Sequence, residues 1–207
     1  TSTYILYTGL KKCGAVVDYE IPDRIRDGYG INRQLVLDAW EAGVDTILTC
    51  DNGISAIEQI AYAKELGMTV IVTDHHELRT TEKNGKTQVI LPDADVVINP
   101  HQPDCLYPYK DLCGGAVAYK LVQELYQKNG FSDSEIEHLI EYAAIATVGD
   151  VMKLTGENRI IVKEGLKRLN LTQNIGLKAL IRANGLEGRE INSYHIGFVI
   201  GPCINAS

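Results

Sequence analysis

Short apolar runs alternate with amphipathic segments along the first half of the chain, as alternating strands and helices do. Apolar runs of this length are typical of strands that a parallel sheet buries on both faces. Ser55 and Glu58 predict a capping box for one helix, which Gly67 ends. The alternation predicts right-handed crossovers and an α/β fold with a doubly wound, mostly parallel sheet. Strands are expected over 16–21, 45–50, 68–73 and 96–98, and helices over 5–13, 33–43 and 55–67.

The second half of the chain, from about Leu112, has mostly helical periodicity. We expect an α/β domain over 1–155, followed by a helical connector and the start of a second domain over 156–207. The polar stretch 77–88 lacks apolar anchors and contains Asn84-Gly85, which predicts an exposed, mobile, hairpin-like excursion without a catalytic part. Helices are expected over 115–129, 133–147, 158–169 and 175–184.

Composition narrows the class of protein. Apolar residues make up 45% and charged residues 23%, which is typical of a soluble globular chain, and no apolar run is long enough to span a bilayer. The five cysteines form no Cys-x-x-Cys pair, which argues against a disulfide framework or structural zinc and favours a reducing cytoplasm. The net charge of −7 is uneven, since 156–195 carries seven basic and four acidic residues. The basic segment could face phosphates, or the imbalance could be only an uneven distribution of surface charge.

Two polar clusters directly follow predicted strands, Asp51-Asn52-Gly53 and Asp74-His75-His76-Glu77. Because ligands bind beyond the carboxyl ends of parallel strands, we expect Asp51 and His75 to lie side by side. Carboxylate and imidazole together suit Mn²⁺, and also Mg²⁺ or Zn²⁺. Successive side chains of a strand point to opposite faces, so only one of the two histidines is expected to be a ligand. The alternatives are a type I turn for the first cluster and two solvated histidines for the second.

A third candidate carboxylate, Asp150, follows the nearly uncharged helical run 142–148. We expect Gly149 to let the backbone turn sharply and direct this side chain. The alternative is that Asp150 caps the N-terminus of a segment that begins near Val151.

The triplet Asp74-His75-His76 is accompanied by other short motifs along the chain. In order these are Ile21-Pro22-Asp23-Arg24-Ile25, Asp27-Gly28-Tyr29-Gly30-Ile31-Asn32, Thr49-Cys50-Asp51-Asn52-Gly53-Ile54, Asn99-Pro100-His101-Gln102, Leu112-Cys113-Gly114-Gly115, Gly149-Asp150 and Gly201-Pro202-Cys203-Ile204-Asn205-Ala206-Ser207. Together they resemble the RecJ branch of the DHH phosphoesterase family over essentially the whole chain.

This resemblance implies a site with two divalent cations, Mn²⁺ or Mg²⁺. Asp51 would bridge them, and His75 and Asp150 would be further ligands. His76 and Asp74 would be the catalytic pair, with His76 beside the metals and the scissile phosphate. Two ions of this kind hold a phosphate and activate the attacking water.

The resemblance also implies a nuclease that hydrolyses single-stranded DNA from its 5′ end in DNA repair and recombination. DNA-repair helicases and single-strand-binding protein would be candidate partners. Arg24 would lie in a phosphate-contacting loop, and Asn205 and Ser207 in a phosphate-binding strand of the following domain. The alternatives are a surface arginine for Arg24 and a simple turn for the other two.

The chain departs from the family pattern at both ends. The family's Asp-x-Asp-Gly motif precedes a Thr-Ser that here is Thr1-Ser2, and the Gly-Arg of many relatives would follow Ser207. Relatives also often have arginine where Cys203 stands. We therefore expect residues 1–207 alone to fold but to be inactive. Two other functions stay open: a DHH hydrolase of short oligonucleotides, nucleotide phosphates or pyrophosphate, and a non-catalytic replication scaffold.

Overall fold

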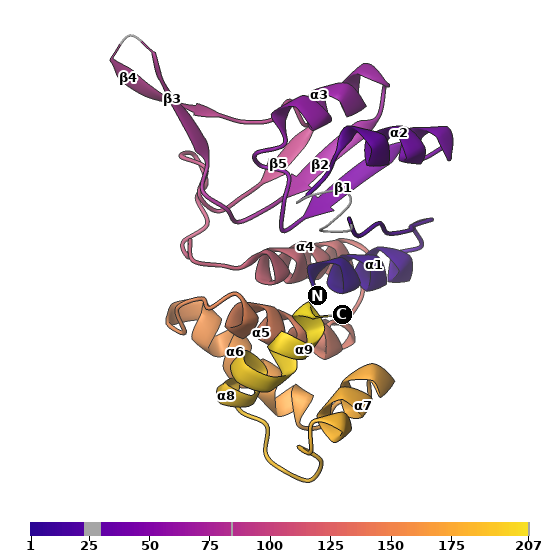
Figure 1. Cartoon of the computed structure of the whole chain (residues 1–207), viewed down its shortest axis with the longest axis vertical. Helices are drawn as coiled ribbons and strands as arrows, with labels where there is room; N and C mark the ends of the chain where they lie inside the picture. Colours follow the sequence, from indigo (N-terminus) through magenta and orange to yellow (C-terminus); the bar gives the residue numbers. More distant parts are fainter. Residues whose placement is uncertain (23–29, 84, 207) are drawn as a thin grey trace. The chain divides into compact units, whose positions relative to one another are not determined.

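The computed structural model describes residues 1–22, 30–83 and 85–206, and these form two compact units. One unit is residues 18–110, and the other combines 1–17 with 111–207. Figure 1 shows the elements of both units. The division of the chain after residue 155 stays a prediction.

The unit of residues 18–110 contains a parallel sheet in the order β1-β2-β5 (Figure 1). Helix α2 precedes the first strand, and α3 connects the first two strands. Both helices pack on one face of β2, where six side chains are at most 2% exposed: Val36, Ile60, Ala63, Met68, Val70 and Val72. This confirms the expected α/β class. The bounds are α2 Arg33–Glu41, β1 Thr46–Cys50, α3 Ile57–Glu65, β2 Thr69–Thr73 and β5 Val96–Ile98.

Three local predictions for this half of the chain are wrong. Residues 16–21 form no strand, and Val16 is fully exposed, because no strand among the described residues pairs with this segment. Strand β1 buries only Thr49, since it pairs with β2 alone within the described residues. The predicted capping box is not formed, because α3 begins at Ile57 after a turn in which the Ala56 N–H donates to the Gly53 carbonyl at 3.0 Å.

The polar excursion is an antiparallel two-stranded ribbon of β3 (Arg79–Lys83) and β4 (Lys86–Ile90). All ten strand residues are exposed, so the predicted exposed hairpin is confirmed. Of the predicted turn, Asn84 lies outside the described residues, and Gly85 has a left-handed φ of 69°.

The other unit is helical, as the periodicity predicts. Helix α5 packs on α6 so closely that a Cβ on Gly165 would lie 2.3 Å from the Ala144 Cβ. Within the described part of the chain, no helix is long and apolar enough to cross a membrane. The elements are α1 Ser2–Lys12, α4 Gly114–Lys128, η1 Asp133–Glu135, η2 Glu137–Leu139, α5 Ile140–Gly149, α6 Gly156–Leu169, α7 Ile175–Ala183, α8 Ser193–His195, the π-helical η3 Ile196–Ile200 and α9 Gly201–Asn205.

The strand expected around Asn205 is wrong, because this residue ends helix α9. The physical reason lies in the preceding residues. Ile196 and Ile200 are fully buried and four residues apart, which is the spacing of one helix face. Helix η3 therefore continues directly into α9.

Candidate metal centre

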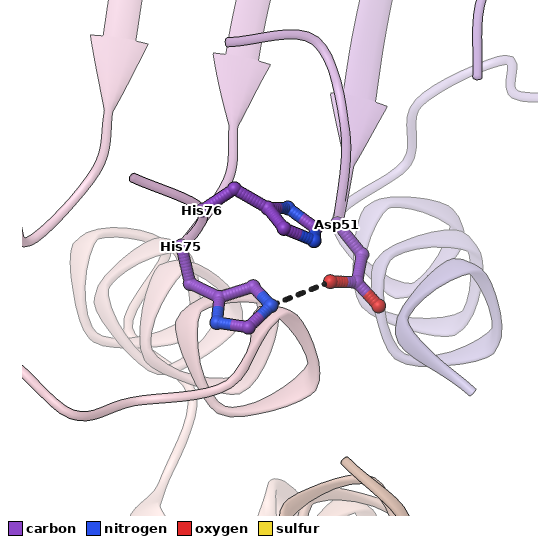
Figure 2. Close-up of side chains that lie close together, drawn as sticks. All are labelled: Asp51, His75 and His76. Atoms are coloured by element: carbon purple, nitrogen blue, oxygen red, sulfur yellow. Dashed lines mark ion pairs between the residues drawn. The ribbon is translucent and has the colours of Figure 1, made fainter. Parts of the chain in front are cut away.

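Asp51, His75 and His76 form one cluster beyond the carboxyl ends of β1 and β2 (Figure 2). Each offers one ligand atom, and these atoms all lie within 4.8 Å of one another. The two strands pair in parallel, with Cys50 opposite Thr73, so the residues that follow them emerge at the same edge of the sheet. The predicted proximity of Asp51 and His75 is confirmed.

The backbone holds Asp51 in an unusual conformation. Its φ is 59°, in the left-handed region that non-glycine residues rarely adopt outside specially constrained sites. Its N–H donates to the Thr73 carbonyl at 3.0 Å, which ties it to the neighbouring strand. Gly53 has a φ of 110°, and a Cβ there would lie 2.5 Å from the Thr49 Oγ1. Both φ values are positive, whereas a type I turn needs negative φ at its central residues, so the type I turn considered for the Asp51 tripeptide is not observed.

His75 contacts Asp51 directly. The His75 Nε2 lies 3.1 Å from the Asp51 Oδ1, and the side chains are 10% and 46% exposed. The hydrogen bond from His75 lowers the pKa of Asp51, while partial burial acts in the opposite direction. Asp51 therefore stays a carboxylate, which is the form that binds a cation.

Asp74 is the buried centre of the local hydrogen-bond network, with its side chain 1% exposed. Its Oδ2 accepts from the Ile54 N–H at 3.0 Å, which joins the loop after β1 to the loop after β2. Its Oδ1 accepts from the N–H groups of His75 at 2.8 Å and His76 at 3.2 Å. Both oxygens thus serve the backbone that presents the cluster.

The Asp74 Oδ1 also lies 2.7 Å from the His76 Nδ1. Because a carboxylate can only accept, we assign the proton to Nδ1, which leaves a lone pair on the His76 Nε2. A carboxylate that supports a histidine in this way is common behind metal ligands, where it orients the ring. The His76 side chain is 59% exposed, so its free nitrogen is accessible.

The expectation that the two histidines point to opposite faces is wrong. Both rings turn toward Asp51, and their centroids are 4.5 Å apart (Figure 2). Strand β2 ends at Thr73, so the alternation of side chains along a strand no longer applies at His75 and His76.

Asn99 supports the same edge of the sheet from the end of β5. It is 2% exposed, and its Nδ2 donates to the His76 carbonyl at 2.9 Å. Its Oδ1 accepts from the His101 N–H at 2.8 Å. The sequence places Asn99 in a motif but indicates no role for it, although a polar residue directly after an apolar strand is a usable signal.

Asp150 belongs to the other compact unit, so its role as a further ligand stays a prediction. It follows α5 as the C-cap, and its N–H donates to the Ala146 carbonyl at 2.9 Å, so the N-cap alternative is wrong. The sharp turn predicted at Gly149 occurs instead at Val151, whose φ is 56°. The Met152 N–H then donates to the Thr147 carbonyl, as in a Schellman motif.

Three residues outside the metal cluster are predicted to contact phosphate: Arg24, Asn205 and Ser207. Arg24 and Ser207 lie outside the described residues. Asn205 is exposed at the end of α9. Binding of phosphate or DNA by these three residues stays a prediction.

The whole chain is similar to exonucleases called RecJ. It is 40% identical over 206 residues to the single-stranded-DNA-specific exonuclease RecJ of Bacillus subtilis (strain 168), which covers 100% of this chain and 24% of that protein. A crystal structure of exonuclease RecJ bound to manganese has a TM-score of 0.83 at 35% identity, covering 99% of this chain and 49% of that one. RecJ of Thermus thermophilus in complex with Mg²⁺ has a TM-score of 0.63 at 30% identity, with 99% and 24% covered.

The chain thus spans about a quarter to a half of the length of these relatives. A family model described as the DHH family, N-terminal domain, matches residues 1–149. This match includes the Asp51, His75 and His76 cluster and covers more than half of the chain. The chain therefore belongs to the DHH family.

Proposed function

We propose that this chain is the metal-binding part of a hydrolase that cleaves phosphodiester bonds in single-stranded DNA from the 5′ end. The observation that carries the proposal is the cluster of Asp51, His75 and His76 at one edge of the parallel sheet. An anionic oxygen and two imidazole nitrogens suit Mn²⁺, and a hard cation such as Mg²⁺ would rely mainly on the carboxylate.

The residues fit a divalent cation in detail. Asp51 is ionised, and the assigned tautomer of His76 leaves its Nε2 available as a ligand. His75 lies 3.1 Å from Asp51, so both can face one ion. In this proposal Asp150 supplies a further carboxylate, and two ions, Mn²⁺ or Mg²⁺, occupy the site. When bound, such ions neutralise the phosphate and lower the pKa of water.

The protein's own residues have distinct roles in this scheme. Asp51, His75 and the Nε2 of His76 would hold the cations. The His76 ring is more than half exposed, so it can also lie beside the scissile phosphate. Asp74 is fully engaged by four hydrogen bonds, so we assign it to positioning the catalytic His76 and not to direct contact with the substrate.

The substrate proposal is supported by the RecJ relatives, which are named for hydrolysis of single-stranded DNA. Structures of such relatives with manganese and with Mg²⁺ support the choice of cations. A role in DNA repair and recombination, a cytoplasmic location, and helicases or single-strand-binding protein as partners belong to the same proposal.

The test is hydrolysis of 5′-labelled single-stranded DNA by the full-length protein with Mn²⁺. Asp51→Asn is the preferred variant, because asparagine tolerates a left-handed backbone better than alanine does. We expect its turnover to fall at least ~100-fold, because a carboxylate that would hold the cations is lost. Asp93→Asn removes an exposed charge from the same unit and is the control, expected to leave turnover unchanged.

Near-normal turnover of the folded Asp51→Asn protein would contradict the metal assignment. Hydrolysis of pyrophosphate or dinucleotides, without hydrolysis of longer strands, would instead support a small-substrate hydrolase. Loss of activity after Asp150→Asn alone would support Asp150 as a further ligand.

A further inference from the structure

The exposed ribbon of β3 and β4 begins close to the candidate metal centre, since Arg79 follows His76 by three residues. The ribbon extends away from the parallel sheet (Figure 1). Residues paired across the strands share a face, and successive pairs alternate between faces. The pairing therefore defines the composition of each face.

One face of the ribbon, which we call the basic face, carries all three of its cations. Its cross-strand pairs are Arg79 with Ile90, Thr81 with Gln88, and Lys83 with Lys86. The opposite face carries Thr80 with Val89 and Glu82 with Thr87, whose hydroxyl donates to the Glu82 Oε1 at 2.6 Å. The basic face thus has three cations and no carboxylate.

This face contrasts with its surroundings. Residues 18–110 contain 8 Lys and Arg against 16 Asp and Glu, so the unit as a whole is acidic. Among the described residues, no ion pair includes Arg79, Lys83 or Lys86. Lys83 and Lys86 lie directly opposite each other, and like charges in that position destabilise a strand pair. A bound anion would relieve this repulsion.

Lysine on an exposed strand also prevents pairing with another chain. That purpose explains lysines on either face, but it does not require Arg79, Lys83 and Lys86 to share one. An extended row of cations suits a polyanion better than a single small anion. Arg79 and Lys83 are four residues apart, or about 13 Å along the strand.

We propose that the basic face of the β3–β4 ribbon contacts the phosphates of the single strand beyond the metal centre. The inference rests on the proposed function and extends it to the substrate path. The ribbon contributes affinity and not chemistry, in line with the prediction that this excursion has no catalytic part. Each contacted phosphate of a single strand lowers the slope of log affinity against log salt by about 0.7.

The experiment measures binding of labelled single-stranded DNA by fluorescence anisotropy with the full-length protein. A chelator is present, so the metal centre contributes no cation. The first variant combines Arg79→Gln, Lys83→Gln and Lys86→Gln. We expect the slope of log affinity against log salt to be less negative by about 2 in this variant. Between about 50 and 200 mM salt, the loss of affinity should therefore be about 20-fold smaller than in the wild-type protein.

The control adds Thr80→Arg, Glu82→Gln and Thr87→Lys to the first variant. It restores the net charge of the ribbon but places the cations on the opposite face. We expect this control to bind like the first variant, with circular dichroism verifying that both are folded. Recovery of the wild-type slope would overturn the proposal, because bulk charge would then suffice.

A salt slope that is unchanged in the first variant would also overturn the inference. If the first variant in that case binds an acidic peptide more weakly than the wild-type protein does, the basic face would be assigned to a protein partner. Neither result bears on the proposed function, which is tested separately by the turnover of the Asp51→Asn protein. Conversely, active Asp51→Asn protein would contradict the proposed function while the binding measurement still reports on the ribbon.

Discussion

The substitution Asp74→Asn tests whether the buried carboxylate behind the cluster organises the metal centre. Asparagine has nearly the same shape but replaces one oxygen by an NH₂ group, which cannot accept a hydrogen bond. The Asp74 Oδ1 serves three donors and the Oδ2 serves one. The amide oxygen will therefore take the Oδ1 position, and the NH₂ group will face the buried Ile54 N–H.

The expected cost follows from these contacts. One charge-assisted hydrogen bond is lost, and the buried Ile54 N–H is left without its acceptor. We expect the free energy of unfolding to fall by about 1–3 kcal/mol. The neutral amide also supports the His76 ring less strongly than a carboxylate, so Mn²⁺ affinity should fall about 10–100-fold.

The assay combines calorimetric titration of Mn²⁺ with urea denaturation of the full-length protein. Asp93→Asn is the matched control, because it removes the same charge from an exposed position of the same unit. A purely structural role for Asp74 would lower stability and leave Mn²⁺ affinity unchanged in the folded protein. That result, or wild-type stability and affinity together, would refute the reasoning.

Two further predictions concern the helical unit. A Cβ on Gly165 would lie 2.3 Å from the Ala144 Cβ and 2.6 Å from the Ile140 carbonyl oxygen, so Gly165→Ala should lower the free energy of unfolding by about 1–3 kcal/mol. Gly149→Ala is the control and should leave stability unchanged, because its Cβ would meet nothing within 4 Å. Equal urea midpoints for the two variants would contradict this prediction. Burial raises the pKa of Glu141, so the folded state binds its proton more tightly and wild-type stability should decline as pH rises above the unfolded value of 4.5. Glu141→Gln should lack that decline, and parallel stability curves from about pH 4 to 8 would count against it.

The sequence by itself determined the class of fold and the place of the site. The apolar runs that became β2 and β5 are too short and too β-branched for helices, and the polar triplet that follows β2 marks where the chain leaves the sheet. Parallel strands present their carboxyl ends at one edge, so the proximity of Asp51 and His75 followed from strand order alone. These are regularities of the backbone, which local patterns record.

Only the tertiary structure decided how the site is organised. Residues 16–21 have a strand-like pattern but join neither sheet of the described residues. Asn205 ends a helix whose buried face is set by contacts with the rest of its unit. The supporting role of Asp74 includes a hydrogen bond from the Ile54 N–H, which is twenty residues away along the chain. Periodicity records which residues are apolar, whereas hydrogen bonds between distant loops depend on three-dimensional positions that no local pattern contains.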